Sequence, residues 1–211
     1  EGSSFTVRTP DGEARVELPL PGLYNVYNAL GAIAAARGLG VPLERIVASL
    51  ATVEAVFGRV ETIDVGGRSL AILLIKNPAG ANEVLRTLAQ EAEKAEKSGT
   101  GGGRLDLWLA LNDRIADGRD ISWIWDADFE LLAEGAGNVT CAGTRAPEMA
   151  LRLKYAGWPE QRIEVVERID ESLDRALQRS GESLFALPTY TALLELRTLL
   201  TRRGLAKDYW E

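Results

Sequence analysis

The chain of 211 residues has no histidine and only one cysteine, Cys141. Without an imidazole it cannot by itself form a Ser-His-Asp or Cys-His catalytic arrangement or a histidine-ligated metal site. A single thiol cannot form an internal disulfide or a thiolate metal cluster, so we expect a reducing, cytoplasmic setting. Cys141 lies in an apolar stretch and is predicted to be an inert, buried side chain.

Long hydrophobic runs and excess positive charge are also lacking. No apolar stretch approaches the roughly 18 residues of a membrane span, and no signal-peptide pattern is present. Acidic residues number 31 against 24 basic ones, giving a net charge of −7, which argues against nucleic acid as a partner. No Gly-x-x-x-x-Gly-Lys-Ser/Thr phosphate loop occurs. The 46% hydrophobic content is enough for a substantial core.

The first part of the sequence predicts a hairpin followed by two helices. Alternating residues at 4–8 and 14–18 flank an Asp11-Gly12 turn, which is typical of a β-hairpin. Helices are predicted at 24–37 and from Pro42 to about residue 50. A two-stranded ribbon is marginal alone. We therefore expect these strands to complete a sheet outside this chain, which would make the chain a fragment.

The remaining sequence alternates strand and helix patterns, which predicts βαβ units and a doubly wound, mostly parallel α/β sheet. A parallel register is expected from the strands at 60–65 and 70–75 onward, and the second of these is apolar enough to be buried on both faces. Ser98 to Gly103 is predicted to be a flexible surface connection. Strands are predicted at 60–65, 70–75, 105–111, 138–142, 162–166 and 184–187, and helices at 81–97, 128–134, 147–156, 171–179 and 190–203.

Polar loops follow four of the predicted strands, at 76–80, 112–114, 143–145 and 188–191. Ligands of an open parallel sheet bind beyond the carboxyl ends of its strands, although polar loops end strands in α/β proteins without any ligand as well. The amine of Lys76 is placed either to offset a phosphate or carboxylate charge or simply to reach water from the sheet edge. Asn77 precedes a proline, which favours an extended exit that presents its amide.

Residues 112–130 are the most unusual stretch, because they combine five aspartates with Trp123 and Trp125. Such a segment is too acidic for a core element and too aromatic for an ordinary solvated loop. The carboxylates could hold Mg²⁺, orient a partner's imidazole or cap a helix, and Asp126 and Asp128 stand where an N-cap would fall. The composition indicates a binding function.

Several motifs carry a family resemblance. Residues 18–36 and 57–61 resemble the junction between the central ATPase domain and the C-terminal domain of Mur ligases. Residues 74–80, 111–118, 122–126 and 189–192 resemble, more specifically, the MurT family, the ligase subunits of lipid II isoglutaminyl synthases. The resemblance assigns residues 1–57 to the end of the central domain and 58–211 to a Rossmann-like C-terminal domain. The residues that it implies for a cleft binding substrate and nucleotide are Arg59, Lys76, Asn77, Asn112 and Asp113.

The resemblance also implies a reaction. Family members use ATP and Mg²⁺ to activate the α-carboxyl of D-glutamate in the lipid II stem peptide as an acyl phosphate, which ammonia converts to D-isoglutamine. The nucleotide, Mg²⁺ and a four-cysteine zinc ribbon belong to upstream regions of the family. The chain itself is therefore expected to hold no metal and to be inactive alone, and to approach a membrane only through lipid II.

A partner is implied as well. A GatD-type glutaminase forms a heterodimer with the ligase subunit and supplies ammonia with a cysteine and a histidine. The acid that orients this histidine is implied to come from the ligase subunit, which suits a chain without imidazole. Residue matching places this acid at Asp120 or Asp126. Trp123 and Trp125 are predicted to contact the glutaminase, because tryptophan is enriched at interfaces.

Two other hypotheses remain open. The chain could act only as a docking module that binds and orders a glutaminase, in which case Asp120 and Asp126 would be dispensable for glutamine hydrolysis. It could instead belong to another Mur-type amino-acid ligase, similar to folylpolyglutamate or cyanophycin synthetases. Such an enzyme would add an amino acid without any glutaminase.

Overall fold

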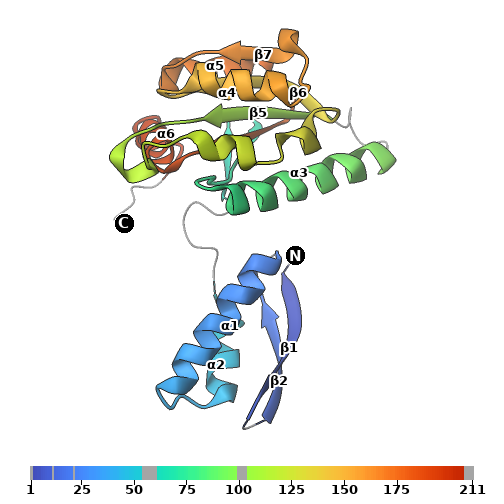
Figure 1. Ribbon diagram of the computed structural model, residues 1–211, viewed down its shortest axis with the longest axis vertical. Coiled ribbons are helices and arrows are strands. Elements are labelled where there is room, and N and C mark those ends of the chain that lie inside the picture. The colour runs from blue at the N-terminus through green and yellow to red at the C-terminus, as the bar shows by residue number, and fades with distance from the viewer. Residues whose placement is uncertain (1, 11, 21, 54–60, 99–103, 207–211) are drawn as a thin grey trace. The chain divides into compact units, whose positions relative to one another are not determined.

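The computed structural model describes residues 2–10, 12–20, 22–53, 61–98 and 104–206 (Figure 1). The chain divides into two compact units, Glu1–Val56 and Phe57–Glu211. Among the residues singled out from the sequence, Arg59 and the connection at 99–103 lie outside the described residues. Assignment of the first unit to a Mur-type central domain stays a prediction.

The first unit contains the expected hairpin and two helices. Strands β1 (Ser3–Thr9) and β2 (Gly12–Leu18) pair antiparallel along their whole length. Helices α1 (Leu23–Gly38) and α2 (Leu43–Leu50) pack against them. The predicted hairpin and both helices are therefore confirmed. A small core of aliphatic side chains holds the unit together, formed by Val7, Val16, Ile33, Leu43 and Ile46.

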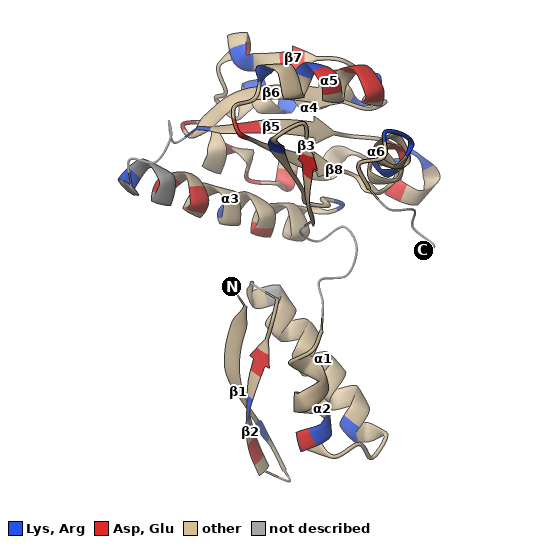
Figure 2. Cartoon of the chain, turned by 180° about the vertical axis from the view of Figure 1, so that it is seen from behind, with Lys and Arg blue, Asp and Glu red and all other residues tan. Residues whose placement is uncertain are grey.

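The second unit is built on a six-stranded sheet with the order β3-β4-β8-β5-β6-β7. All neighbouring pairs from β4 to β7 are parallel, which confirms the doubly wound, mostly parallel α/β sheet. Figure 2 shows that strands β6 and β8 carry no charged residues, as expected for the buried middle of such a sheet. The strands are β3 (Glu61–Val65), β4 (Arg68–Ile72), β5 (Leu105–Ala110), β6 (Ala136–Ala142), β7 (Ile163–Val165) and β8 (Ser183–Pro188).

The first two strands of this sheet differ from the prediction. Strands β3 and β4 pair antiparallel, so the expected parallel register was wrong for this pair. The cause is the Gly66-Gly67 turn, whose φ values of 63° and 83° suit a two-residue hairpin. Strand β4 also ends at Ile72 rather than at residue 75, although the amides of Leu73 and Ile75 still donate to β8 carbonyls.

Helices cover both faces of the sheet. Strand β5 shows the division, because Leu107 and Leu109 pack in the cluster that contains α3 and α4, while Trp108 packs in the cluster that contains α5 and α6. The indole N–H of Trp108 donates to Ser172 Oγ on α5 (2.9 Å). The helices are α3 (Pro78–Ser98), α4 (Ala146–Tyr155), α5 (Ile169–Arg179) and α6 (Tyr190–Arg202). None of the helices in the described part of the chain is long and apolar enough to span a membrane.

The acidic, tryptophan-containing segment follows β5. It forms three short 3₁₀ helices, η1 (Ile115–Asp117), η2 (Ser122–Asp126) and η3 (Phe129–Leu132), so the α-helix predicted at 128–134 was wrong. Side chains from later in the chain bind carbonyls before and within this stretch. The Arg152 guanidinium donates to the carbonyls of Ile124 and Ala127, and the Trp158 indole donates to the carbonyl of Phe129. Tertiary contacts thus overrode the local helical pattern.

Candidate functional site

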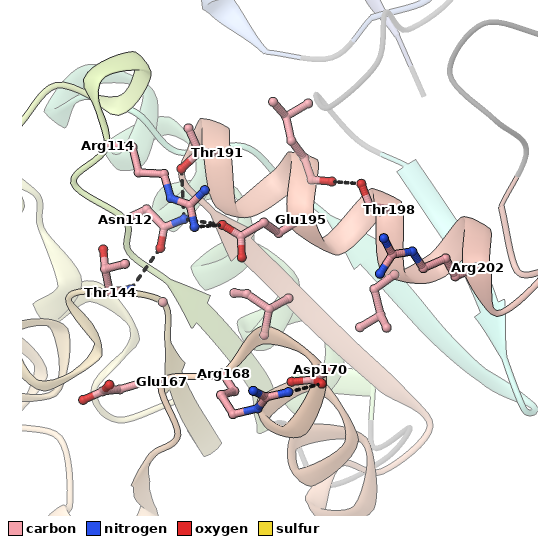
Figure 3. A pocket seen from close by; sticks show the side chains of 14 residues that line it. Asn112, Arg114, Thr144, Glu167, Arg168, Asp170, Thr191, Glu195, Thr198 and Arg202 are labelled. Carbon is pink, nitrogen blue, oxygen red and sulfur yellow. Dashed lines mark hydrogen bonds and ion pairs between the residues drawn. The ribbon is translucent and has the colours of Figure 1, made fainter.

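A groove of about 750 Å³ lies at the carboxyl ends of β5, β6, β7 and β8. Its walls are formed by the loops that follow these strands and by one side of α6 (Figure 3). Three of the four polar loops singled out from the sequence therefore meet here, those at 112–114, 143–145 and 188–191. This is the edge of a parallel sheet at which ligands bind.

Asn112 joins three of the groove's loops. Asn112 is buried (2% exposed), and both its amide NH₂ and its amide oxygen have hydrogen-bond partners. Its Nδ2 donates to Thr191 Oγ1 (2.9 Å) and to Glu195 Oε1 (3.2 Å), and its Oδ1 accepts from the Thr144 backbone N–H (3.0 Å). Gly143 makes room for it, because a Cβ there would lie 2.6 Å from Asn112 Oδ1.

Asp113 ties the loop after β5 to the loop after β6. Its carboxylate accepts from Thr144 Oγ1 and from Arg145 Nε, both at 2.8 Å. These two hydrogen bonds hold the pKa of Asp113 below its ordinary value. Glu148 in turn pairs with Arg145. Asp113 therefore remains a charged structural link between neighbouring strands.

The sequence reasoning singled out neither Glu195, which lines the groove, nor the contact of Asp117 with the lining residue Thr191. Glu195 forms an ion pair with Arg114 (2.7 Å), and Figure 3 shows Asn112 and Arg114 both directed at its carboxylate. Asp117 accepts hydrogen bonds from the N–H and the hydroxyl of Thr191 (2.8 and 2.5 Å). Helical spacing was the available signal for Glu195, because residues 191 and 195 fall on one face of the predicted helix.

The groove carries charge of both signs. Arg114, Arg168 and Arg202 line it together with three acidic residues, and Arg168 is paired with Asp170 (2.7 Å). Arg202 forms no ion pair with any of the described residues. Such a surface suits a polar ligand that bears an anionic group.

Lys76 and Asn77 follow β4 and lie outside the lining of this groove. Both are exposed. Asn77 Oδ1 accepts the backbone N–H of Gly80 (2.8 Å), so it caps the start of α3. One hydrogen bond to its side-chain oxygen is thus made within the chain, and its NH₂ group is the donor that it could offer a ligand. Their role in a substrate cleft stays a prediction.

The two candidate acids differ in how they are held. Both Asp120 and Asp126 are exposed. One oxygen of Asp120 accepts the Ser122 N–H (2.8 Å), and hydrogen bonding from Ser122 lowers the pKa of Asp120. Asp126 ends η2 and has no hydrogen-bond partner among the described residues. Asp128 precedes η3 but makes no capping hydrogen bond with its side chain, so the predicted N-cap role was wrong for both Asp126 and Asp128.

An exposed aromatic pair lies beside this segment. The Trp125 side chain is 50% exposed and meets Tyr155 edge to face, with ring centroids 5.7 Å apart. The guanidinium of Arg152 lies against the Trp125 ring at 5.5 Å. Trp123 is partly buried against the sheet's core. Trp125 is thus accessible to a partner, while the predicted contact of both tryptophans with a glutaminase stays a prediction.

Two observations concern the acidic side chains and the single thiol. Among the described residues, no group of three or more acidic or cysteine side chains is arranged to hold a metal ion. Cys141 lies on β6 and is fully buried, and burial raises the pKa of its thiol to about 12. The predicted burial of Cys141 is confirmed, and its lack of reactivity stays a prediction.

Comparison with known proteins gives consistent matches. The family described as MurT ligase C-terminal matches residues 74–193. The chain is 35% identical over 191 residues to the MurT subunit of lipid II isoglutaminyl synthase (glutamine-hydrolyzing) from Streptococcus pneumoniae, covering 90% of this chain and 40% of that protein. It is 34% identical to the subunit of the same name from Staphylococcus aureus, covering 90% of this chain and 41% of that protein. It thus spans about two fifths of the length of these curated relatives.

Solved structures agree on the fold. A pseudomurein peptide ligase type C from Methanothermus fervidus superposes with a TM-score of 0.66 at 20% sequence identity, covering 96% of this chain and 40% of that one. At this level of identity the likeness concerns the fold alone.

Proposed function

Because the chain belongs to the MurT ligase family, we propose that it forms part of the ligase subunit of a lipid II isoglutaminyl synthase. In this proposal the whole subunit amidates the α-carboxyl of D-glutamate in the lipid II stem peptide, giving D-isoglutamine, with energy from ATP. The nitrogen is ammonia that a GatD-type glutaminase releases from glutamine. The reaction takes place in the cytoplasm, and the subunit meets the membrane only through lipid II.

The observation that carries the proposal is the state of Asp120. Its carboxylate is fixed through one oxygen by Ser122, while the residue as a whole is exposed. The lowered pKa keeps it ionised at neutral pH. An orienting acid needs these properties, because it must hold a histidine tautomer and stabilise the imidazolium that forms. These 211 residues contain no histidine, so the histidine that this acid would orient lies outside them.

The ligation reaction needs contacts to the substrate (the ligase site is called the synthetase half below). The residues of the groove and Lys76 are the proposed contacts. The described residues hold neither a phosphate loop nor a set of carboxylates suited to Mg²⁺. In this proposal ATP, Mg²⁺ and zinc are therefore bound by other parts of the ligase subunit. The chain's own contribution is to bind and orient the substrate, with Lys76 offsetting charge on the carboxylate or acyl phosphate.

The first unit fits a place within a larger domain. Helix α1 is apolar around most of its circumference, yet Ala32, Ala34, Ala35 and Tyr27 are exposed in this chain. A helix that is apolar all round is normally buried. This supports the assignment of residues 1–57 to the end of a Mur-type central domain.

The proposed partner surface comprises Trp125 and Tyr155, together with the partly buried Trp123 of the same segment. Exposed aromatic side chains are frequent anchors of protein interfaces, and the neighbouring carboxylates suit a partner that presents histidine and basic groups. Among the alternatives, the match to the MurT family favours this interpretation over a folylpolyglutamate or cyanophycin synthetase. A docking role without catalysis remains the competing hypothesis.

The test uses Asp120→Asn and Asp126→Asn in the full-length ligase subunit assembled with its glutaminase, and Asp128→Asn as a matched control on the same segment. If Asp120 is the orienting acid, its variant should lower glutamine hydrolysis by roughly 10³- to 10⁴-fold. Amidation with free ammonia should be retained. If both candidate variants hydrolyse glutamine normally while still binding the glutaminase, the triad role is wrong and the docking hypothesis stands.

A further inference from the structure

The segment that carries Asp120 is attached to the groove through Asp117. Both carboxylate oxygens of Asp117 bind Thr191, one at its N–H (2.8 Å) and the other at its hydroxyl (2.5 Å). Asp117 also accepts the N–H of Arg114 (3.2 Å). Thr191 lies in the first turn of α6, 74 residues away along the chain. A single carboxylate thus joins η1 to a helix of the groove wall.

Asp120 lies between two anchors. On one side η1 is held to α6 by Asp117, and the turn that follows contains Gly118 with φ of 83°. On the other side Ile124 is buried, and its carbonyl accepts a hydrogen bond from Arg152. Loss of either anchor frees one end of the short stretch that carries Asp120. The position of its carboxylate therefore depends on the bond between Asp117 and Thr191.

The hydrogen bond between Asp117 and Thr191 lies at the edge of the groove. The Thr191 side chain lines the groove, and its hydroxyl also accepts from Asn112 Nδ2 (2.9 Å). A ligand that takes a hydrogen bond from either group competes with Asp117 or pulls on it. The Thr191 hydroxyl has a single proton, which it donates to Asp117. A ligand acceptor in the groove could take this proton only by displacing Asp117, and this exchange would link occupancy of the groove to the position of Asp120.

We propose that Asp117 is a positioning residue that sets the place of Asp120 and links glutamine hydrolysis to occupancy of the groove through Thr191. This inference rests on the proposed function, in which Asp120 orients the histidine of the glutaminase. Its consequence is that ammonia is released fastest when the synthetase half holds its substrates. The residue acts through Asp120 and does not touch glutamine itself.

The experiment compares Thr191→Val, which removes the hydroxyl at nearly constant shape, with Thr191→Ser, which keeps it. Both are made in the full-length subunit and assembled with the glutaminase. Thr191→Val and Asp117→Asn should lower kcat for glutamine hydrolysis by roughly 10- to 100-fold, the range for a small displacement of a catalytic group. The KM for glutamine should stay unchanged, because glutamine binds to the partner. Thr191→Ser should retain the wild-type kcat.

Two controls and two readouts separate positioning from general damage. Thr87→Val removes a hydroxyl that bonds only within α3, and Asp128→Asn removes an exposed charge from the same segment as Asp117. Neither should change hydrolysis. Amidation with free ammonia should be retained in Asp117→Asn, and the acceleration of hydrolysis by the ligation substrates should be lost in Thr191→Val.

The outcomes distinguish a failure of the inference about Asp117 from a failure of the proposed function. If Asp120→Asn abolishes hydrolysis while Thr191→Val and Asp117→Asn behave like the wild type, positioning by Asp117 is refuted and the proposed function stands. Equal losses in Thr191→Ser and Thr191→Val would also refute it, as would wild-type hydrolysis that ignores the ligation substrates. If Asp120→Asn and Asp126→Asn both hydrolyse glutamine normally, the proposed function itself fails.

Discussion

The guanidinium of Arg152 is 4% exposed and lies 5.5 Å from the ring centroid of Trp125, whose own side chain is half exposed. A buried cation therefore supports an exposed aromatic ring. The same guanidinium donates to the carbonyls of Ile124 and Ala127 and to Glu130. One side chain of α4 thus fixes the backbone and an exposed side chain of the tryptophan-containing segment.

Replacement of Arg152 should be strongly destabilising. In Arg152→Met the carbonyls of Ile124 and Ala127 lose their donor, so we expect the free energy of unfolding to fall by about 3 kcal/mol or more. Urea denaturation measures the change. Lys154 lies on the same helix as Arg152, and Lys154→Ala breaks only an exposed ion pair with Glu160, so it should cost far less stability. Equal effects of the two variants would contradict the anchoring role.

A methyl group at Gly143 should disturb the groove. Gly143 and Gly157 both have positive φ, 87° and 85°, but only at Gly143 would a Cβ press against Asn112 and Leu111. Alanine at either position pays for the backbone conformation, about 1 kcal/mol. We expect Gly143→Ala to lower the melting temperature clearly more than Gly157→Ala. Matching melting temperatures would show that the loop yields easily.

Trp125 should contribute to glutaminase binding. Trp125→Ala is expected to weaken the complex by about 2 kcal/mol if the residue is an interface anchor, as measured by calorimetry with the full-length subunit. Trp123→Ala should weaken it as well, with an added loss of stability because Trp123 packs on the core. Val165→Ala provides the control, since Val165 is similarly exposed (45%) on the edge strand β7. Ammonia-dependent amidation should persist in all three.

The Cys141 thiol should be unreactive in the folded chain. With its pKa raised to about 12 by burial, almost no thiolate exists at pH 8, so a thiol reagent should label it only after unfolding. The unfolded thiol ionises near its ordinary pKa of about 8.5. The unfolded state therefore binds fewer protons between these two values, and stability should fall as pH rises through this window. Cys141→Ala should show a flatter alkaline profile, and rapid labelling of the native chain would contradict the burial.

Lys76 should act in the synthetase half alone. Lys76→Ala is expected to lower amidation with free ammonia by roughly 10- to 1000-fold, the range for loss of one charge-stabilising donor. Glutamine hydrolysis by the assembled complex should be much less affected. Lys97→Ala, at the other end of α3, should leave amidation unchanged. Full ammonia-dependent activity in Lys76→Ala would exclude this lysine from the reaction.

The sequence was sufficient for most of the fold, because periodicity and turn residues act locally. Asp11-Gly12 predicted a hairpin and Pro42 a helix start, and both are present. The orientation of β3 against β4 was missed, although the Gly66-Gly67 turn between them was visible. The buried run at 70–75 suggested a parallel sheet and outweighed the turn signal.

The site was predictable only in part. Asn112 was found because a polar residue directly after a buried strand is a local signal. Its partners Thr191 and Glu195 lie about 80 residues later, and nothing local in the sequence indicates such pairing. The helix predicted at 128–134 failed for a similar reason, since Trp158 binds the carbonyl of Phe129 and Arg152 binds the carbonyl of Ala127 just before this stretch.

Strand β5 belongs to both layers of the second unit, with Leu107 and Leu109 in one core cluster and Trp108 in the other. Neither layer can open without exposing one side of this strand. The two layers should therefore unfold together as one cooperative unit, and the amides of β5 should exchange with solvent only through global unfolding. Asn112, which lines the groove, lies two residues beyond the end of this strand, so one wall residue of the groove is held next to the amides expected to exchange most slowly.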